Sequence, residues 1–253
     1  MLHERDRTNH LLYRFDHIPD ASLRRRVFER FMVTARLDHP HILNVQNVGY
    51  DDTGRLCVVT TYPGNQDGLV TLEDLRQQRG GVLEFAEVQR LIEQLLETSQ
   101  HAYERGIAHG PFRLDELLVD RHGCTLVELF GLEHALHPSH SDQGAVAEQV
   151  RSVAELAMIL LGGVIDERVS ASAIGFPRKS ERAWELWFSH ALDPLRGFDT
   201  PELAISAIPG RAGAPTRLAE PKPTQGASRQ GRVLQRFRAV GNVRSRRRDN
   251  RSD

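Results

Sequence analysis

The sequence has little of what would stabilise a secreted or metal-bound protein. Only two cysteines, Cys57 and Cys124, occur in 253 residues, without a C-x-x-C pair or a Cys/His cluster. We therefore expect neither a disulfide framework nor a metal site. The longest apolar stretch, near residues 156–164, is far shorter than the ~20 residues of a transmembrane helix, and the first ten residues lack the apolar core of a secretory signal. These absences predict a cytoplasmic protein with no transmembrane segment.

The chain also has almost no net charge, but its charges are unevenly distributed. The formal net charge is −1, whereas residues 211–253 hold twelve Lys/Arg and three Asp/Glu, so this tail carries +9 and the remaining residues carry −10. From residue 209 onward the composition is rich in Pro, Gly, Ser, Gln and Arg, and no apolar period is sustained. We therefore expect an acidic folded body followed by a disordered basic tail.

Hydrophobic periodicity and turn residues predict a strand-rich first part and a helical second part. The turn residues 51–54 join two apolar runs into a hairpin, and Gly106 suits a left-handed helix end. The expected helices cover residues 23–37, a segment capped by Thr71, and residues 84–105, 145–161, 181–192 and 201–208. The expected strands cover residues 10–15, 41–50, 55–62, 117–119 and 125–129. This order indicates an α+β fold.

Several segments in this order resemble bacterial serine/threonine protein kinases. ARLDHPHILNVQNVGYDDTGRLCVVTTY is similar to that family's end of helix C, its HPNIV-type turn, the next strands and the hinge. TLEDLRQQRGGVLEFAEVQRLIEQLLETSQHAYERGIAHG is similar to the helix after the hinge and the long helix that leads to the catalytic loop. The resemblance covers about residues 10–208 and is strongest over residues 35–132.

This resemblance implies a bilobal protein kinase-like fold with a truncated β-rich N-lobe and a mainly helical C-lobe. Residues 9–62 would form the truncated N-lobe and hinge, and residues 63–208 the helical C-lobe. Residues 209–253 would form the disordered Arg-rich tail. In the family, a nucleotide lies between the two lobes.

The catalytic-loop signature H-R-D-x-x-x-x-N is only partly present. His109 matches its histidine, but Pro111 replaces the aspartate that serves as base, and proline has no proton acceptor in its side chain. Glu116 occupies the metal-binding asparagine position. Its carboxylate is a hard oxygen ligand that could hold magnesium, or it could simply be a solvated loop residue.

The metal-binding D-F-G motif has lost its aspartate. Leu129, Phe130 and Gly131 occupy its three positions, and leucine cannot coordinate a cation. Glu128 precedes them, but neighbouring side chains of an extended segment point to opposite faces, so Glu128 would need a one-residue slip to replace the aspartate.

The nucleotide-binding positions of the N-lobe are also changed. No G-x-G-x-x-G loop occurs, and the lysine position falls on Tyr13 or Arg14, of which only Arg14 keeps a positive charge. The gatekeeper and hinge positions hold Thr60, Thr61 and Tyr62, where an adenine would meet backbone groups. In the C-lobe, Gln149 replaces a buried aspartate that would hold the catalytic loop, and no A-P-E anchor occurs.

These losses together predict a pseudokinase, not an enzyme, that acts as a protein-interaction or regulatory scaffold. We expect no cofactor and no metal, although weak ATP binding at Arg14, Thr60, Thr61 and Tyr62 stays open. One alternative is a divergent ATP-dependent serine/threonine kinase that uses displaced carboxylates, namely Asp115, Glu116 and Glu128.

The basic tail allows a second alternative. Residues 229–251 contain nine arginines, which could bind nucleic acid or an anionic surface. Apart from Phe237 this segment lacks the interleaved aromatics that favour stacking on single strands. A solubilising tail explains the same composition.

Overall fold

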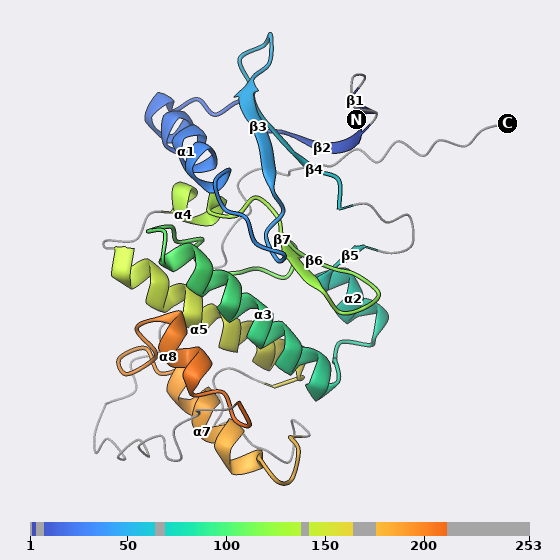
Figure 1. The fold of residues 1–253 in the computed structure, drawn as a ribbon, viewed down its shortest axis with the longest axis vertical. Helices are drawn as coiled ribbons and strands as arrows, with labels where there is room; N and C mark the ends of the chain where they lie inside the picture. The colour runs from blue at the N-terminus through green and yellow to red at the C-terminus, as the bar shows by residue number, and fades with distance from the viewer. Residues whose placement is uncertain (1, 4–7, 64–68, 138–141, 164–175, 212–253) are drawn as a thin grey trace, which may run out of the picture.

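The computed structural model describes residues 2–3, 8–63, 69–137, 142–163 and 176–211, and these form a strand-rich part above a helical part (Figure 1). The strands are β1 (Leu2–His3), β2 (Thr8–Arg14), β3 (Val45–Tyr50), β4 (Leu56–Thr61), β5 (Val70–Thr71), β6 (Leu117–Val119) and β7 (Thr125–Val127). The helices are α1 (Ala21–Thr34), α2 (Leu72–Gln78), α3 (Phe85–Tyr103), α4 (Leu132–Leu136), α5 (Asp142–Leu160), α7 (Glu181–Ala191) and α8 (Pro201–Ser206).

The N-terminal part, which we call the N-lobe, is a small antiparallel sheet with one helix. Its strand order is β1-β2-β4-β3, so β4 lies between β2 and β3. The predicted hairpin of β3 and β4 is confirmed, with Tyr50 opposite Leu56. The Asp51 carboxylate closes its turn by accepting hydrogen bonds from the backbone N–H groups of Thr53 and Arg55.

Helix α1 packs on this sheet through a narrow apolar face. Val27 and Phe31 are fully buried and belong to one cluster with Leu56 and Val58 of β4. The Asp20 side chain caps the helix by accepting from the N–H groups of residues 22 and 23. The predicted helix is confirmed, and it begins two residues earlier than expected because of this cap.

The C-terminal part, which we call the C-lobe, is built on the long helix α3. Its apolar face packs against α5 and α8 and contributes to one large core with the aromatic residues of α7. Trp184 and Trp187 are almost fully buried, and the Trp187 indole N–H donates to the Ala204 carbonyl at 3.1 Å. After α3, Gly106 has a φ of 68°, which confirms the predicted left-handed helix end.

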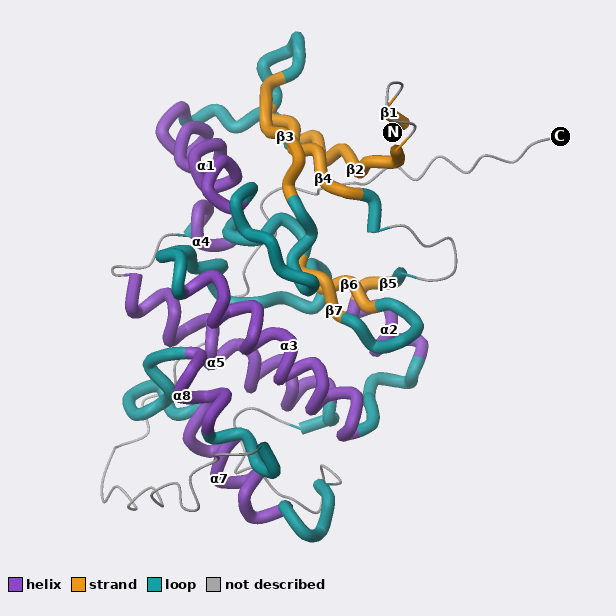
Figure 2. Tube along the Cα trace, viewed as in Figure 1, coloured by secondary structure: helices purple, strands orange, loops and turns teal. Residues whose placement is uncertain are grey.

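A second small sheet, of order β5-β6-β7, lies between the two lobes (Figure 2). It is also tied to the loop before β3, because Ile42 forms a parallel bridge with Val127. The Leu43 N–H donates to the Val127 carbonyl, and the Val127 N–H donates to the His41 carbonyl. These bonds fix β7, and the residues that follow it, beneath the N-lobe.

The predicted elements occur in the predicted order among the described residues, and the short strands β1 and β5 and the short helix α4 are elements that we did not expect. The predicted disorder of the tail concerns residues 212–253, which lie outside the described part of the chain. Among the described helices, none combines the length and the apolar character that crossing a membrane requires.

Three histidines join the loop before β3 to α3, and they predict a pH dependence of stability. The ring of His39 lies 4.9 Å from that of His101 and 5.5 Å from that of His41. Burial, with positive charge on the other two rings, lowers the pKa of His39 to about 4. The unfolded chain therefore binds this proton at higher pH than the folded chain does, so stability should fall as pH drops from about 6.5 towards 4.

We expect His39→Asn to reduce this loss, because the amide oxygen can still accept from the His41 N–H, as the His39 ring does. The check is Tm measured at several pH values, with the exposed His137→Asn as control. An equal pH slope in the wild type and His39→Asn would contradict this role.

Candidate functional site

The predicted catalytic residues meet where the lobes join, around the side chain of His109. His109 is fully buried, and its ring lies between Phe112 and Phe130, with ring centres 4.7 and 4.8 Å away. Its carbonyl accepts from the His134 N–H at 2.8 Å. His109 thus connects the loop before β6 to the segment after β7 and to the start of α4.

The hydrogen bonds of His109 define its tautomer. Nδ1 accepts from the backbone N–H of Gly131 at 2.9 Å, so in the neutral ring the proton is on Nε2. Nε2 lies 2.8 Å from Oε1 of Glu116 and donates to it. The same Oε1 accepts from the Arg113 N–H at 2.9 Å. Among the described residues no hydrogen bond uses the other oxygen of Glu116.

Gln149, which we counted as the loss of an aspartate that would hold the catalytic loop, holds this loop itself. Its buried Oε1 accepts from the N–H groups of His109, at 2.8 Å, and of Gly110, at 3.4 Å. Its amide nitrogen donates to the Ser99 hydroxyl of α3 at 2.7 Å. A neutral amide therefore anchors this loop to α5 and α3.

The segment Leu129-Phe130-Gly131 turns sharply after β7. Leu129 has a φ of 46°, which is unusual for a residue with a side chain, and Gly131 has a φ of 87°. Phe130 is fully buried in the C-lobe core, while Leu129 belongs to the N-lobe cluster around Phe31. Leu129 thus forms an apolar contact between the lobes. The alternation of side chains between the two faces of a strand ends at this residue.

Glu128, just before this turn, lies at the junction, where we did not expect it. The Tyr13 hydroxyl of β2 donates to Glu128 Oε1 at 2.6 Å. Burial, followed by the negative charges of Glu116 and Asp115, raises the pKa of Glu128, and the hydrogen bond from Tyr13 offsets part of that rise. Burial and the nearby Glu128 charge also raise the pKa of Tyr13, so the phenol keeps its proton and donates.

The structure does not bring Arg14 to this junction. Arg14 is exposed and pairs with Asp51 of the hairpin, to which its Nε donates at 2.6 Å. Alternate residues of a strand point to opposite faces, so Tyr13, and not Arg14, takes the inward position. Sequence reasoning left these two residues open and missed the role of Tyr13 as the partner of Glu128.

The hinge residues are placed at and after the end of β4. Thr60 is fully buried. The N–H of Thr61 donates to the Asn44 carbonyl at 3.0 Å, and the N–H of Tyr62 donates to the Asn9 carbonyl at 3.3 Å. Pro63, which follows, has no N–H. The Thr61 carbonyl accepts from the Thr60 hydroxyl at 3.2 Å, so the N–H groups of Thr61 and Tyr62 and the Thr61 carbonyl all have partners within the chain.

Pro111 is exposed at the surface of the catalytic loop, and two charged residues follow it. The Arg113 guanidinium donates twice to the Asp115 carboxylate, at 3.0 and 2.8 Å. The hydrogen bond from Arg113 lowers the pKa of Asp115, which keeps this carboxylate ionised. Asp115 is thus a charged proton acceptor four residues after the position that proline occupies.

The donor set at the junction fits a divalent cation in part. Glu116 and Glu128 are hard oxygen ligands, and magnesium in phosphate-transferring proteins is commonly held by one or two carboxylates plus the phosphates. The described residues contain no group of three or more His, Cys, Asp or Glu side chains placed to hold a metal on their own. No lysine is present at Tyr13 to meet a phosphate, so that part of the nucleotide site does not fit the usual pattern.

Comparisons with known proteins agree with this arrangement. No family model matches the chain. It is 33% identical over 102 residues to CBL-interacting protein kinase 25 of Oryza sativa subsp. japonica, across 40% of this chain and 19% of that protein. It is 27% identical over 125 residues to the serine/threonine-protein kinase PrkC of Bacillus subtilis (strain 168), across 49% and 18%. The matched region is thus less than a fifth of each relative.

Two solved structures share the fold. The kinase domain of Mycobacterium tuberculosis PknI has a TM-score of 0.59 at 21% identity, over 78% of this chain and 84% of that chain. The Neurospora crassa PAN3 pseudokinase has a TM-score of 0.65 at 10% identity, over 82% and 54%. The chain therefore has a protein kinase-like fold, as predicted.

One prediction needs correction. From Pro111 and Leu129 we expected that the chain is not an enzyme, but the sequence relatives are named protein kinases, one of them a serine/threonine-protein kinase, which contradicts that expectation. The position of Glu128 gives the physical reason why the losses at Pro111 and Leu129 led to a wrong prediction. Glu128 continues the pairing of β6 and β7, since its N–H donates to the Glu116 carbonyl at 3.0 Å, and its side chain lies on the face opposite the buried Val127. A carboxylate therefore reaches the junction although the aspartate is missing.

The anchoring role of Gln149 gives a stability prediction. We expect Gln149→Leu to lower the free energy of unfolding by about 2–4 kcal/mol, because buried N–H groups would lose their acceptor. Gln143→Leu, at an exposed position of the same helix, should change it by less than ~0.5 kcal/mol. Urea unfolding of both variants checks this, and equal stability of the two would contradict the anchor.

Proposed function

We propose that the chain is a divergent ATP-dependent serine/threonine kinase-type domain that uses displaced carboxylates. The observation that carries the proposal is the position of Glu128, which lies at the lobe junction under the electrostatic influence of Glu116 and Asp115. A carboxylate whose pKa is raised by neighbouring negative charges, as that of Glu128 is, becomes easier to ionise when a cation lies beside it. Within the described residues, neither Glu116 nor Glu128 pairs with a lysine or arginine side chain.

In this proposal Glu116 and Glu128 hold a divalent cation together with the nucleotide phosphates. The cation supplies positive charge for the oxygens of the transferred phosphoryl group. Glu116 is prepared for this role because Oε1 is fixed by His109 and Arg113, which leaves its other oxygen for a ligand. Glu128 is fixed through one oxygen by Tyr13 in the same way.

The remaining roles fall to residues of the same loop and of the hinge. Asp115, ionised beside Arg113, would accept the hydrogen bond of the substrate hydroxyl in place of the missing base. Carbonyl groups at Thr61 and Tyr62 would accept from the adenine amino group. Phosphoryl transfer depends chiefly on positioning and electrostatics. We therefore expect loss of the usual base to affect mainly the rate of the reaction and its mechanism less.

Thermal stability with ATP and magnesium tests this function. With both present at 100 times Kd, we expect Tm to rise by roughly 5–10 °C, and we expect magnesium-dependent release of the ATP γ-phosphate. Glu128→Gln and Glu116→Gln should each abolish most of the magnesium-dependent part of the rise.

Glu202→Gln is the matched control, because Glu202 is exposed on α8. The proposal fails if ATP with magnesium leaves Tm and the γ-phosphate unchanged, or if the control loses as much of the shift as Glu128→Gln.

The raised pKa of Glu128 adds a pH dependence. Without a cation, the folded chain holds this proton at higher pH than the unfolded chain does, so Glu128 should lower stability as pH rises above about 4.3. Magnesium competes with that proton, so its apparent affinity should increase as pH rises through the raised pKa. Calorimetric titration of magnesium and ATP at several pH values checks this, and Glu128→Gln should give a flatter profile.

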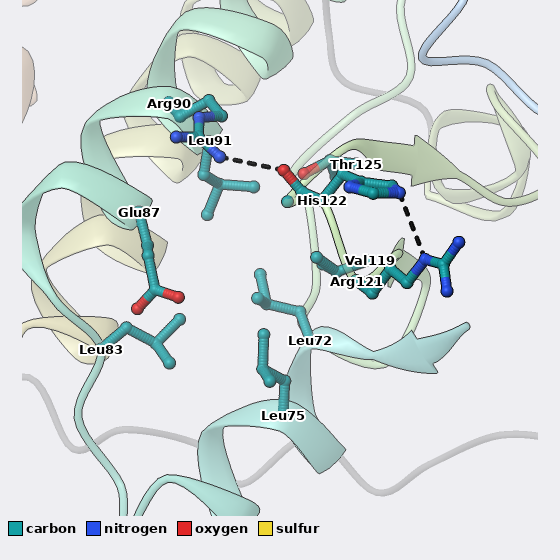
Figure 3. Close-up of a pocket in the computed structure, with 11 residues that line it drawn as sticks. Leu72, Leu75, Leu83, Glu87, Arg90, Leu91, Val119, Arg121, His122 and Thr125 are labelled. Atoms are coloured by element: carbon teal, nitrogen blue, oxygen red, sulfur yellow. Dashed lines mark hydrogen bonds between the residues drawn. The ribbon is translucent and has the colours of Figure 1, made fainter. Parts of the chain in front are cut away.

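We also propose a second function, the binding of a protein partner. The observation that favours it is a small cavity on the C-lobe, lined by leucines and by charged side chains (Figure 3), whose lining includes none of the residues of the lobe junction. The basic segment 229–251, for which we proposed nucleic acid or an anionic surface, lies outside the described residues, and that role stays a prediction. A bacterial origin and a cytoplasmic location also stay predictions.

A further inference from the structure

A second cluster of titratable side chains lies away from the lobe junction, where the loop before β3 meets α3. His39 and His41 come from this loop, His101 comes from the last turn of α3, and all three are half-buried. The ring of His39 contacts both of the others, with ring centres 5.5 Å from His41 and 4.9 Å from His101. We call these three residues the histidine cluster.

His41 attaches the loop before β3 to β7. Its carbonyl accepts from the Val127 N–H at 2.9 Å. Its ring nitrogen Nδ1 donates to the Thr125 carbonyl at 2.8 Å, since a carbonyl can only accept. The Leu43 N–H adds a bond to the Val127 carbonyl at 3.0 Å, so the loop lies along β7 (Figure 2). Residues 39–43 thus hold the strand that leads to Glu128.

The position of His41 depends on an unprotonated His39. Nδ1 of His39 accepts from the His41 N–H at 3.3 Å. An imidazole nitrogen accepts only while it carries no proton, and a ring with two protons donates at both nitrogens. A second proton on His39 would therefore place two N–H groups against each other and break this bond. The positive ring would also lie close to His101.

Burial opposes a positive charge in the histidine cluster. It is the largest cause that lowers the pKa of His39 to about 4, and it also lowers the pKa of His101. Nε2 of His101 is buried and, in the part of the chain that the structure describes, has no hydrogen-bond partner. Protons should therefore bind more readily once the loop has moved away from α3 and water reaches both rings.

The charged groups that face the cluster come from the loop, from α3 and from the turn before β7. Arg105, just after α3, opposes protonation of His39 and His101. Cys124, whose Sγ lies 3.6 Å from Nδ1 of His41, stays a neutral thiol because burial raises its pKa. Three carboxylates favour protonation but offset only part of the effect of burial, namely Asp38 in the loop and Glu97 and Glu104 at α3.

We propose that the histidine cluster is an acid-sensitive latch that holds residues 39–43 against β7. At neutral pH His39 accepts from His41, and the latch is closed. When His39 takes up a proton, the His41 N–H loses its acceptor, the loop moves away from α3, and its backbone bonds to Val127 break. The strand that leads to Glu128 is then attached less firmly. This inference does not rest on the kinase-type function, because the latch opens without nucleotide.

Amide hydrogen exchange of the full chain, followed by NMR at about pH 7.5 and about pH 5, tests the latch. After correction for the intrinsic rates, we expect the protection of the Val127 and Leu43 amides to fall at least about fivefold at the lower pH. The His39 pKa of about 4, against ~6.5 for a free ring, sets an upper limit of roughly 30-fold.

The same measurement separates opening of the latch from unfolding of the whole chain. Leu95 is fully buried in the middle of α3, so its amide reports global unfolding. At about pH 5 we expect Val127 and Leu43 to exchange at least about tenfold faster than Leu95. Urea up to about 1 M should leave their exchange nearly unchanged but accelerate that of Leu95, because a local opening exposes little surface.

Variants assign the pH response to the cluster. His39→Asn keeps an acceptor for the His41 N–H but cannot take up a proton, so it should remove most of the response at Val127. His17→Asn, at an exposed position before α1, should respond as the wild type does. His101→Phe keeps a ring beside His39 but gains no proton. It should reduce the response, and it decides the question if His39→Asn fails to fold.

The proposal is wrong if the Val127 and Leu43 amides exchange at about pH 5 with the rate and the urea dependence of Leu95, since only global unfolding would then expose them. It is also wrong if their protection does not change with pH, or if His39→Asn and His101→Phe respond to pH as strongly as the wild type does.

Discussion

The buried ring of His109 is the constraint on which the lobe junction depends. It has no exposed surface, and its two nitrogens have fixed roles, since Nδ1 accepts from Gly131 and Nε2 donates to Glu116. Its backbone is held by Gln149, whose amide also reaches α3 through Ser99. The catalytic-type loop, the turn after β7 and two long helices are therefore positioned by one buried residue and its partners. A neutral glutamine can hold this backbone because its amide oxygen accepts hydrogen bonds from two N–H groups, which needs no charge.

The position of the carboxylates follows from this constraint. Because Gly131 is tied to His109, the chain between Val127 at the end of β7 and Gly131 must turn within a few residues, and Leu129 adopts a left-handed conformation there. Leu129 then fills an apolar site beneath α1, and Glu128 reaches Tyr13 of β2. The lobes are joined by an apolar contact and by a buried phenol–carboxylate hydrogen bond. This bond uses one oxygen of Glu128.

Much of the fold could be predicted from the sequence, because its signals are local. The Asp51 turn, the Thr71 cap and the Gly106 helix end each depend on one residue and its immediate neighbours, and each is present as expected. The kinase-like order also placed His109 and Gln149 correctly. The contact of Glu128 could not be predicted, because it depends on how the N-lobe sheet lies over the segment after β7, which no local pattern indicates. Its partner Tyr13 is 115 residues away in the chain.

The central claim is that Glu116 and Glu128 together hold a divalent cation at the lobe junction. Crystals grown with manganese and a non-hydrolysable ATP analogue test it most directly, because manganese can replace magnesium at oxygen ligands and scatters anomalously. The account predicts one anomalous peak at coordination distance from a carboxylate oxygen of each residue, with the analogue's phosphates completing the shell. Bound analogue without that peak, or a peak ligated by neither carboxylate, would contradict it.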